Sequence, residues 1–497
     1  MEKDGKRWKK MEKENDFLKV LYKVMSKTKT RKKYKKKGGK VIASGGYGCV
    51  FRPMLKCTGT LKRTPNTISK LMTKNHAIDE YNEILRLNKL LTKIPNYKDY
   101  FLIYGTTICK PAALSHEDLE SYNHKCSALP KDDITKKNIN TKLDKLMTVN
   151  IPYGGLPVDD YIYSNGSYPK IYKVYSNLID LLKNGIIPMN EHRVYHSDIK
   201  DSNVLIDGTS GIARLIDWGL TVEYNPTTKL EFPHNWKNRP LQFNVPFSVI
   251  LFTDAFNTKY TAYLKKGGKT TAEELTPFVT SYLKTWMKYR GFGHYKLINE
   301  IMYMLHSNKI KHIPMKQRPD MIEKEITVPT IVNYIVDVLV HYTKFKEDGS
   351  LNLREYLDDV YIKIVDIYGF INIYFPLLEM LFNNYSYLNN NELNILTQIE
   401  VIFNEYLYKP RHEPINMTML FKDLNEIGTL LNYIKTNDPI RRSVVNSLEV
   451  NVPKTDSNTV TTELDPTKMT NKTSPTQIFK RKYLNKRFKN PKFVSTK

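Results

Sequence analysis

The string Tyr-His-Ser-Asp-Ile-Lys-Asp-Ser-Asn (residues 195–203), followed by Asp-Trp-Gly (residues 217–219), decides the fold class that we predict for this chain. These strings place an acid, a lysine and an amide in one loop and a second acid shortly after it. Asp198 can accept the proton of an attacking hydroxyl group, with Lys200 beside the phosphate that is moved. Asn203 and Asp217 offer hard oxygen ligands of the kind that Mg²⁺ prefers. The pattern therefore predicts phosphoryl transfer from a nucleotide.

Either string alone is also common in ordinary turns. Their surroundings favour the chemical interpretation, because two short apolar runs, residues 204–206 and 213–216, flank an Asp207-Gly208 turn signal. This arrangement predicts a small hairpin with the acidic loop at one side and Asp217 at the other.

A glycine-rich segment, residues 42–51, lies far upstream and reads Ile-Ala-Ser-Gly-Gly-Tyr-Gly-Cys-Val-Phe. Glycine lets backbone N–H groups approach phosphate oxygens without a Cβ atom in the way. A plain hairpin turn uses the same residues, so the position of the segment ahead of the other motifs carries the interpretation. The residues expected to line the nucleotide site are Ile42, Ala43, Ser44, Gly45, Gly46, Tyr47, Gly48, Cys49 and Val50.

Lys70 follows in a short apolar run that predicts a strand, and we expect it to pair with the phosphates. The next segment, residues 76–94, has apolar residues at helical spacing. Glu80 and Glu83 lie three residues apart on one face of this helix, so either can reach Lys70. Glu83 is preferred because Ile and Leu follow it, and the alternative is a solvated helix acid.

Two further elements are expected between the glycine-rich segment and the acidic loop. Residues 146–155 read as an apolar strand that ends in a Tyr-Gly-Gly bend, after a long polar connection. Residues 172–183 repeat apolar positions at helical spacing, and Gly185 predicts the end of that helix.

Together these motifs resemble those of the eukaryotic-type serine/threonine protein kinases, over residues 41–219. The strings Pro-Tyr-Gly-Gly and Ile-Asp-Trp-Gly resemble in particular the divergent kinases of large nucleocytoplasmic DNA viruses (iridovirus-, mimivirus- and asfarvirus-like). The resemblance implies an α+β, bilobal fold with a small β-rich N-lobe and a larger, mainly α-helical C-lobe. It also implies ATP and Mg²⁺ as cofactors and a protein substrate, with Lys200 favouring serine and threonine over tyrosine.

The chain departs from the family pattern in three places. Ser197 replaces the arginine that normally pairs with a phosphorylated activation loop, which predicts activity without that phosphorylation. Residues 239–247 are a plausible end of the activation segment but lack the usual Ala-Pro-Glu. Asp366 is the best candidate for the buried aspartate of the large lobe, although a helix N-cap is nearly as good an interpretation. Its late position predicts a helical insertion over residues 251–353.

The predicted organisation is a basic segment at 1–37, an N-lobe at 38–153, a C-lobe at 154–445 and a disordered basic tail at 446–497. The formal net charge is +26, and basic runs gather at both ends. Such ends can contact nucleic acid or an acidic surface, or simply aid solubility. Four cysteines and no N-terminal apolar segment predict an intracellular, reducing location, which for a viral protein means host cytoplasm, nucleus or virion. The stretch 367–382 is too short and too polar to predict a transmembrane segment.

Two other functions remain open at this point. A small-molecule kinase of the aminoglycoside or choline type shares the His-x-Asp and Ile-Asp-Trp strings, although Lys200 and the glycine-rich segment weigh against it. A catalytically inactive, nucleic-acid-binding or virion protein with a kinase fold would explain the basic ends. Retention of Lys70, Asp198, Asn203 and Asp217 weighs against that interpretation.

Overall fold

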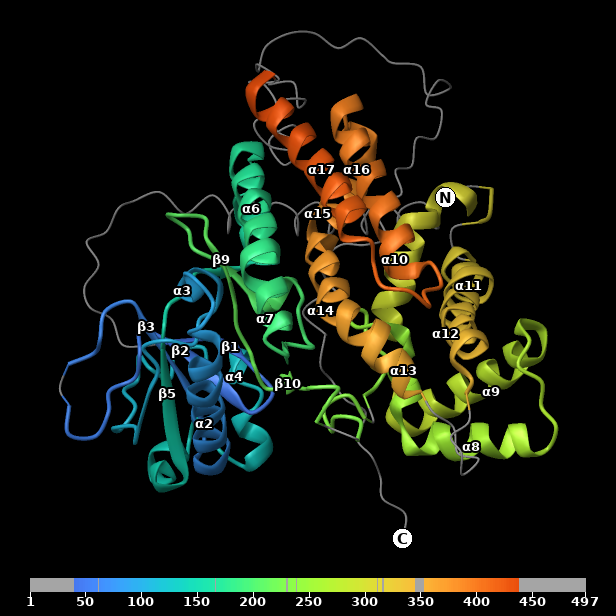
Figure 1. Cartoon of the computed structure of the whole chain (residues 1–497). Coiled ribbons are helices and arrows are strands. Elements are labelled where there is room, and N and C mark those ends of the chain that lie inside the picture. The colour runs from blue at the N-terminus through green and yellow to red at the C-terminus, as the bar shows by residue number, and fades with distance from the viewer. Residues whose placement is uncertain are drawn as a thin grey trace, which may run out of the picture. The chain divides into compact units, whose positions relative to one another are not determined.

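The computed structural model describes residues 40–437, apart from residues 61, 166, 229–230, 238, 311, 315–316 and 345–352. The fold is mixed α+β, with a small antiparallel sheet region near the N-terminus and a mostly helical remainder (Figure 1). The described residues divide into two compact units: unit 1 holds residues 40–73 and 109–148, and unit 2 holds residues 74–108 and 149–437. Residues 74–108, expected in the N-lobe, therefore belong to unit 2. The two basic ends lie outside the described residues.

A five-stranded sheet has the order β1-β2-β3-β5-β4. Its strands are β1 (Lys40–Ser44), β2 (Gly48–Arg52), β3 (Thr67–Thr73), β4 (Thr107–Cys109) and β5 (Leu146–Pro152). The register pairs Gly48 with Met72 and Val50 with Lys70. A Cβ atom at Gly48 would lie 2.2 Å from Met72 Cγ and 2.6 Å from the Leu71 carbonyl oxygen, so the close approach of β2 and β3 requires glycine there.

The long polar connection between β4 and β5, residues 110–145, supplies much of the core of unit 1. Its buried residues Leu119, Tyr122, Leu129 and Ile139 pack with strand residues such as Phe51 in one apolar cluster. The salt bridge from Arg63 to the buried Asp118 ties the β2–β3 connection to the same segment, with Nη2 2.9 Å from Oδ1. The connection is therefore an integral layer of unit 1 rather than a surface loop.

The four cysteines form two disulfides, Cys49–Cys126 and Cys57–Cys109, with Cα–Cα distances of 5.3 and 5.8 Å. The low cysteine count gave no sign of these disulfides, because the fold brings together cysteines that lie 77 and 52 residues apart in the sequence. The compartment of the protein stays a prediction.

Unit 2 contains two small sheets and most of the helices. One sheet pairs β7 (Val194–Tyr195) with β10 (Val222–Glu223). The other has the order β6-β8-β9, with β6 (Leu156–Pro157), β8 (Val204–Ile206) and β9 (Ala213–Leu215). The helices are α2 (Lys74–Leu91), α3 (Tyr97–Tyr100), α5 (Val158–Asn165), α6 (Tyr168–Asp180), α7 (Ile187–Glu191), α8 (Asp254–Lys265), α9 (Ala272–Arg290), α10 (Tyr295–His306), α11 (Arg318–Ile322), α12 (Val328–Tyr342), α13 (Arg354–Tyr356), α14 (Ile362–Ile371), α15 (Phe375–Asn383), α16 (Asn390–Phe403) and α17 (Met417–Asn437). The described part of residues 251–353 is thus helical, as predicted.

The helix predicted over residues 172–183 forms, but it does not end at Gly185. Helix α6 continues as a π-helical turn, Leu181–Ile186, directly into α7. A Cβ atom at Gly185 would lie 2.9 Å from the Tyr100 side chain. Glycine is needed there for close packing against α3, and not as a C-cap.

The most apolar helical run, Arg354–Asn383, is long and apolar enough to cross a membrane by length and composition alone. Its apolar window is 94% buried inside the structure, as is usual for the central helix of a folded domain. The described residues therefore give no clear indication of a transmembrane segment.

Removal of the Cys49–Cys126 disulfide should destabilise unit 1 by about 2–4 kcal/mol, because the cross-link restricts the unfolded chain. Without reductant, we expect Cys49→Ala/Cys126→Ala to melt at a lower temperature than the wild type. Addition of dithiothreitol should lower the melting temperature of this variant less than that of the wild type. Thiol titration of the denatured, unreduced wild type should detect no free cysteine. Four titratable thiols would contradict both disulfides.

Candidate active site

Asp198 lies in the loop between β7 and β8, and its carboxylate is held by three side chains. Lys200 Nζ lies 2.6 Å from Oδ2, and Asn203 Nδ2 donates to the same oxygen at 2.9 Å. Asn244 Nδ2 donates to Oδ1 at 2.9 Å. Burial, the largest single effect, raises the pKa of Asp198, but Lys200, Asn244 and Arg239 together outweigh it and lower the pKa. The carboxylate is therefore ionised at neutral pH, as a proton acceptor must be.

His196 supports this loop from the inside. Its Nδ1 accepts the backbone N–H of Asp198 at 3.3 Å, so Nε2 carries the proton and donates to the Ile216 carbonyl at 3.0 Å. The ring packs against Trp218, with centroids 4.8 Å apart. Burial lowers the pKa of His196, which keeps the imidazole neutral. His196 thus ties the loop that holds Asp198 to the backbone of Ile216, the residue before Asp217.

Asp366 anchors the same loop from helix α14, in which every residue except Lys363 is buried. Its Oδ2 accepts the backbone N–H of His196 at 2.8 Å, and its Oδ1 accepts that of Ser197 at 2.7 Å. Burial raises the pKa of Asp366 to about 7, against the opposing effect of these two amides and Arg239. The expected buried aspartate is confirmed, and the N-cap alternative is wrong because Asp366 lies within the helix.

Ser197, which stands where the family has arginine, is contacted by residues of the predicted activation segment. Arg239 Nη1 donates to the Ser197 carbonyl at 2.7 Å, and Trp236 Nε1 donates to Ser197 Oγ at 2.9 Å. Arg239 is buried, and its Nη2 lies 4.0 Å from Asp198 Oδ1. A guanidinium group thus lies beside the loop, although it comes from a later part of the chain.

Sequence reasoning missed Arg239, Asn244 and Trp236 as site residues. In the sequence, residues 239–247 indicate only the end of the predicted activation segment, and no spacing rule links them to Asp198. The available signal was a lone arginine in an aromatic and apolar stretch, because a buried arginine needs an acidic or carbonyl partner.

Asn203 and Asp217 lie at the same end of the predicted hairpin, which forms as β8 and β9. The backbone N–H of Ile216 donates to the Asn203 carbonyl at 3.0 Å, so Asp217 follows directly from that pairing. Asp217 is exposed and has a φ of 64°. Asn203 uses its amide nitrogen on Asp198, which leaves Oδ1 to face a cation. An amide oxygen and a carboxylate at one edge fit the oxygen ligands that Mg²⁺ takes.

The predicted nucleotide-binding residues of unit 1 share one corner of the sheet. Gly45 N–H donates to the Gly48 carbonyl at 2.9 Å and closes the turn between β1 and β2. Lys70 lies on β3, and its Cε would be 3.7 Å from a Cβ atom at Gly45. The side chain of Lys70 therefore lies beside Gly45, and its role in phosphate binding stays a prediction.

Some residues around that turn are held by contacts with another segment, and others are exposed. Ser44 accepts the backbone N–H groups of Ser127 and Ala128, both at 3.1 Å, and Cys49 is held by its disulfide. Tyr47 is exposed and Gly46 faces open space. Residues 45–47 at the tip are exposed, as are Ile42 and Ala43. Ser44 and Cys49 are held by the 126–128 segment.

Glu83 has a partner on its own helix. Arg86 donates to its carboxylate through Nε at 2.9 Å and Nη2 at 2.7 Å, and Arg86 Nη1 also contacts Glu223 on β10. The hydrogen bonds that Arg86 donates to Glu83, and the negative charges of Glu83 and Glu223, raise the pKa of Arg86. Pairing of Lys70 with Glu83, or with Glu80, stays a prediction.

Substitution Asp366→Ala should lower the free energy of unfolding by about 2–5 kcal/mol, because it leaves two buried amide N–H groups without an acceptor. Urea denaturation monitored by circular dichroism measures the change. Asp359→Ala, at an exposed position in the preceding helical turn, is the control and should stay within about 0.5 kcal/mol of the wild type. Equal losses in the two variants would show that Asp366 does not anchor the loop.

Comparison with models of known protein families gives no match for this chain, and comparison with curated protein sequences gives none either. The function is therefore argued from the residues and contacts described above.

Proposed function

We propose that the chain is an ATP- and Mg²⁺-dependent serine/threonine protein kinase with a bilobal kinase fold. The observation that carries the proposal is the ionised carboxylate of Asp198, held by Lys200, Asn203 and Asn244 in a loop that Asp366 clamps. These groups give a proton acceptor, a cation and an amide within hydrogen-bonding distance of one another. Phosphoryl transfer depends mainly on such positioning and charge neutralisation.

Each residue has a defined role in this proposal. Asp198 orients the substrate hydroxyl and takes its proton as the bond to phosphorus forms. Lys200 has three donor hydrogens, so it can hold Asp198 and a phosphate oxygen together. Mg²⁺, when bound, neutralises phosphate charge, and Asn203 and Asp217 would hold it. The glycine turn and Lys70 would bind the nucleotide phosphates.

The proposal requires the residues of unit 1 and unit 2 to meet on one nucleotide. Each unit supports the proposal by its own contacts. In unit 1, Lys70 lies beside the glycine turn. In unit 2, Asp198, Asn203 and Asp217 lie in one loop and the hairpin that follows it. Protein hydroxyls are the preferred substrates because Lys200 follows the serine/threonine pattern of the family that the motifs resemble.

Asp198→Asn should lower kcat about 10²–10⁴-fold and leave ATP affinity nearly unchanged, because the amide cannot accept the hydroxyl proton. Transfer of radiolabelled phosphate to basic and acidic generic proteins measures kcat, and calorimetry measures ATP binding. Asp160→Asn, an exposed position on α5, is the control. Undiminished transfer would reject the role of Asp198. Phosphorylation of choline or aminoglycosides alone would favour the small-molecule alternative, and ATP binding without turnover in the wild type would favour the inactive one.

Arg239 should keep the predicted activation segment in place without phosphorylation. We expect Arg239→Met to lower kcat about 10–100-fold, the equivalent of one charge-assisted hydrogen bond, while the KM for ATP changes little. Arg318→Met, at the start of α11, is the matched control. Phosphatase treatment of the wild type should leave kcat unchanged, and loss of activity on that treatment would contradict the prediction.

A further inference from the structure

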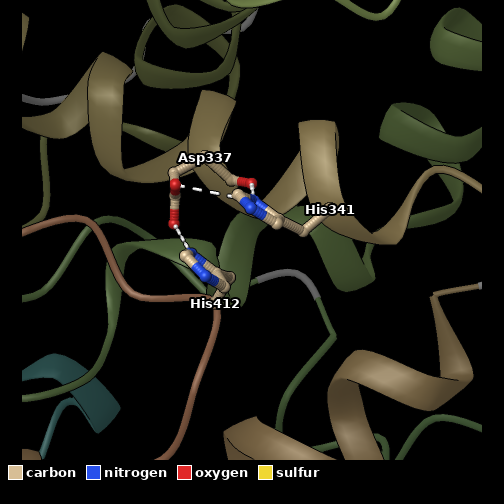
Figure 2. Close-up of side chains that lie close together, drawn as sticks. All are labelled: Asp337, His341 and His412. Atoms are coloured by element: carbon tan, nitrogen blue, oxygen red, sulfur yellow. Dashed lines mark hydrogen bonds and ion pairs between the residues drawn. The ribbon is translucent and has the colours of Figure 1, made fainter.

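A cluster of one aspartate and two histidines lies in unit 2, on elements that the proposed reaction does not use. Asp337 and His341 are one turn apart on α12, and His412 comes from the segment 409–416, just before α17. Figure 2 shows the three side chains turned toward one another across these two elements. Their possible ligand atoms all lie within 4.8 Å of one another.

Asp337 holds both imidazoles. His412 Nδ1 lies 2.9 Å from Asp337 Oδ2, and His341 Nδ1 lies 2.8 Å from the Asp337 carbonyl oxygen and 3.6 Å from Oδ1 (Figure 2). Since both oxygens accept hydrogen bonds, each Nδ1 carries its proton, and each Nε2 keeps a lone pair. A metal ion can take the place of the proton between His412 Nδ1 and Asp337 Oδ2, with the ring proton carried by Nε2 instead, so that the imidazole and the carboxylate bind the same ion.

The position of the cluster leaves space for further ligands. The side chains of Asp337, His341 and His412 are 20%, 43% and 37% exposed, so water can complete a coordination shell. Tyr342 donates to the His412 carbonyl at 2.9 Å and fixes the backbone of the segment next to α12. The nearby Arg411 is engaged by Glu405 and the Tyr406 ring.

The two imidazole rings are stacked, with centroids 3.5 Å apart and planes inclined by 6°. Lone pairs of parallel rings do not converge on one point. Binding of an ion therefore requires one ring to turn out of the stack, and His341 is the more exposed of the two. Its rotation breaks the stacking contact and the hydrogen bond of Nδ1 to the Asp337 carbonyl oxygen, whereas Asp337 and His412 stay side by side as ligands.

We propose that Asp337, His341 and His412 bind one divalent transition-metal ion of the Zn²⁺ class. Two imidazole nitrogens and one carboxylate oxygen suit Zn²⁺ and Co²⁺, whereas Mg²⁺ prefers ligand sets made of oxygen. The ion links α12 to the segment before α17 and so adds a cross-link between residues far apart in sequence. This site is independent of the proposed kinase reaction and of its Mg²⁺.

The test uses the full, oxidised chain, freed of metal with a chelator and kept in millimolar Mg²⁺. Calorimetry with Zn²⁺ should give one site, and Co²⁺ should produce visible absorption bands that Zn²⁺ removes. His412→Ala and His341→Ala should each weaken Zn²⁺ binding at least about tenfold. His312→Ala, an exposed histidine outside the cluster, is the matched control and should bind as the wild type does. Zn²⁺ should raise the melting temperature of the wild type and the control only.

The proposal is overturned if the wild type binds no Zn²⁺ at up to submillimolar concentrations. It is equally overturned if both cluster variants bind Zn²⁺ as tightly as the control does. Circular dichroism of each variant separates weakened binding from a loss of fold, and Asp337→Asn, which retains the side-chain shape, provides a further variant that should also bind more weakly.

Discussion

The contact between Asp366 and the backbone of residues 196–197 is the constraint on which the candidate site depends. The buried carboxylate of Asp366 accepts two consecutive amide N–H groups, which ties the loop to α14. Gly369, one turn further along α14, has no Cβ atom, and one there would lie 2.7 Å from the Ile199 carbonyl. The loop therefore sits directly on the helix. The position of Asp198 follows from this packing, because its side chain leaves the clamped backbone at a fixed point.

Charge around this loop is balanced by groups that come from different parts of the chain. Two buried carboxylates, Asp198 and Asp366, lie near the buried guanidinium of Arg239, which affects the pKa of both. A buried charge without a partner is costly, so none of the three is easily replaced alone. Arg239 comes from a later segment of the chain, and it brings a guanidinium group to the loop that holds Ser197 and Asp198.

Unit 1 uses covalent and polar contacts where a small sheet has little apolar core of its own. The connection between β4 and β5 provides much of that core, and the Cys49–Cys126 disulfide joins it to β2. The Cys57–Cys109 disulfide joins the β2–β3 connection to the end of β4. Ser44 and Cys49 lie at opposite ends of the glycine turn, and both are bound to residues 126–128. The proposed phosphate-binding loop is therefore held at its ends and open at its tip, an arrangement that limits the entropy lost when a ligand binds.

Local patterns determined much of this protein. The hairpin around Asp207, the strand with Lys70, the helix after it and the buried helix with Asp366 could all be predicted, because alternation, helical spacing and turn residues act over a few positions. Contacts across long separations could not. The disulfides, the continuation of α6 past Gly185, and the approach of Arg239 and Asn244 to Asp198 depend on which surfaces meet after folding. The types of residue at the site can be read from the sequence. Which of them share a buried space depends on the packing of the folded chain, because burial and charge pairing arise only when distant segments come together.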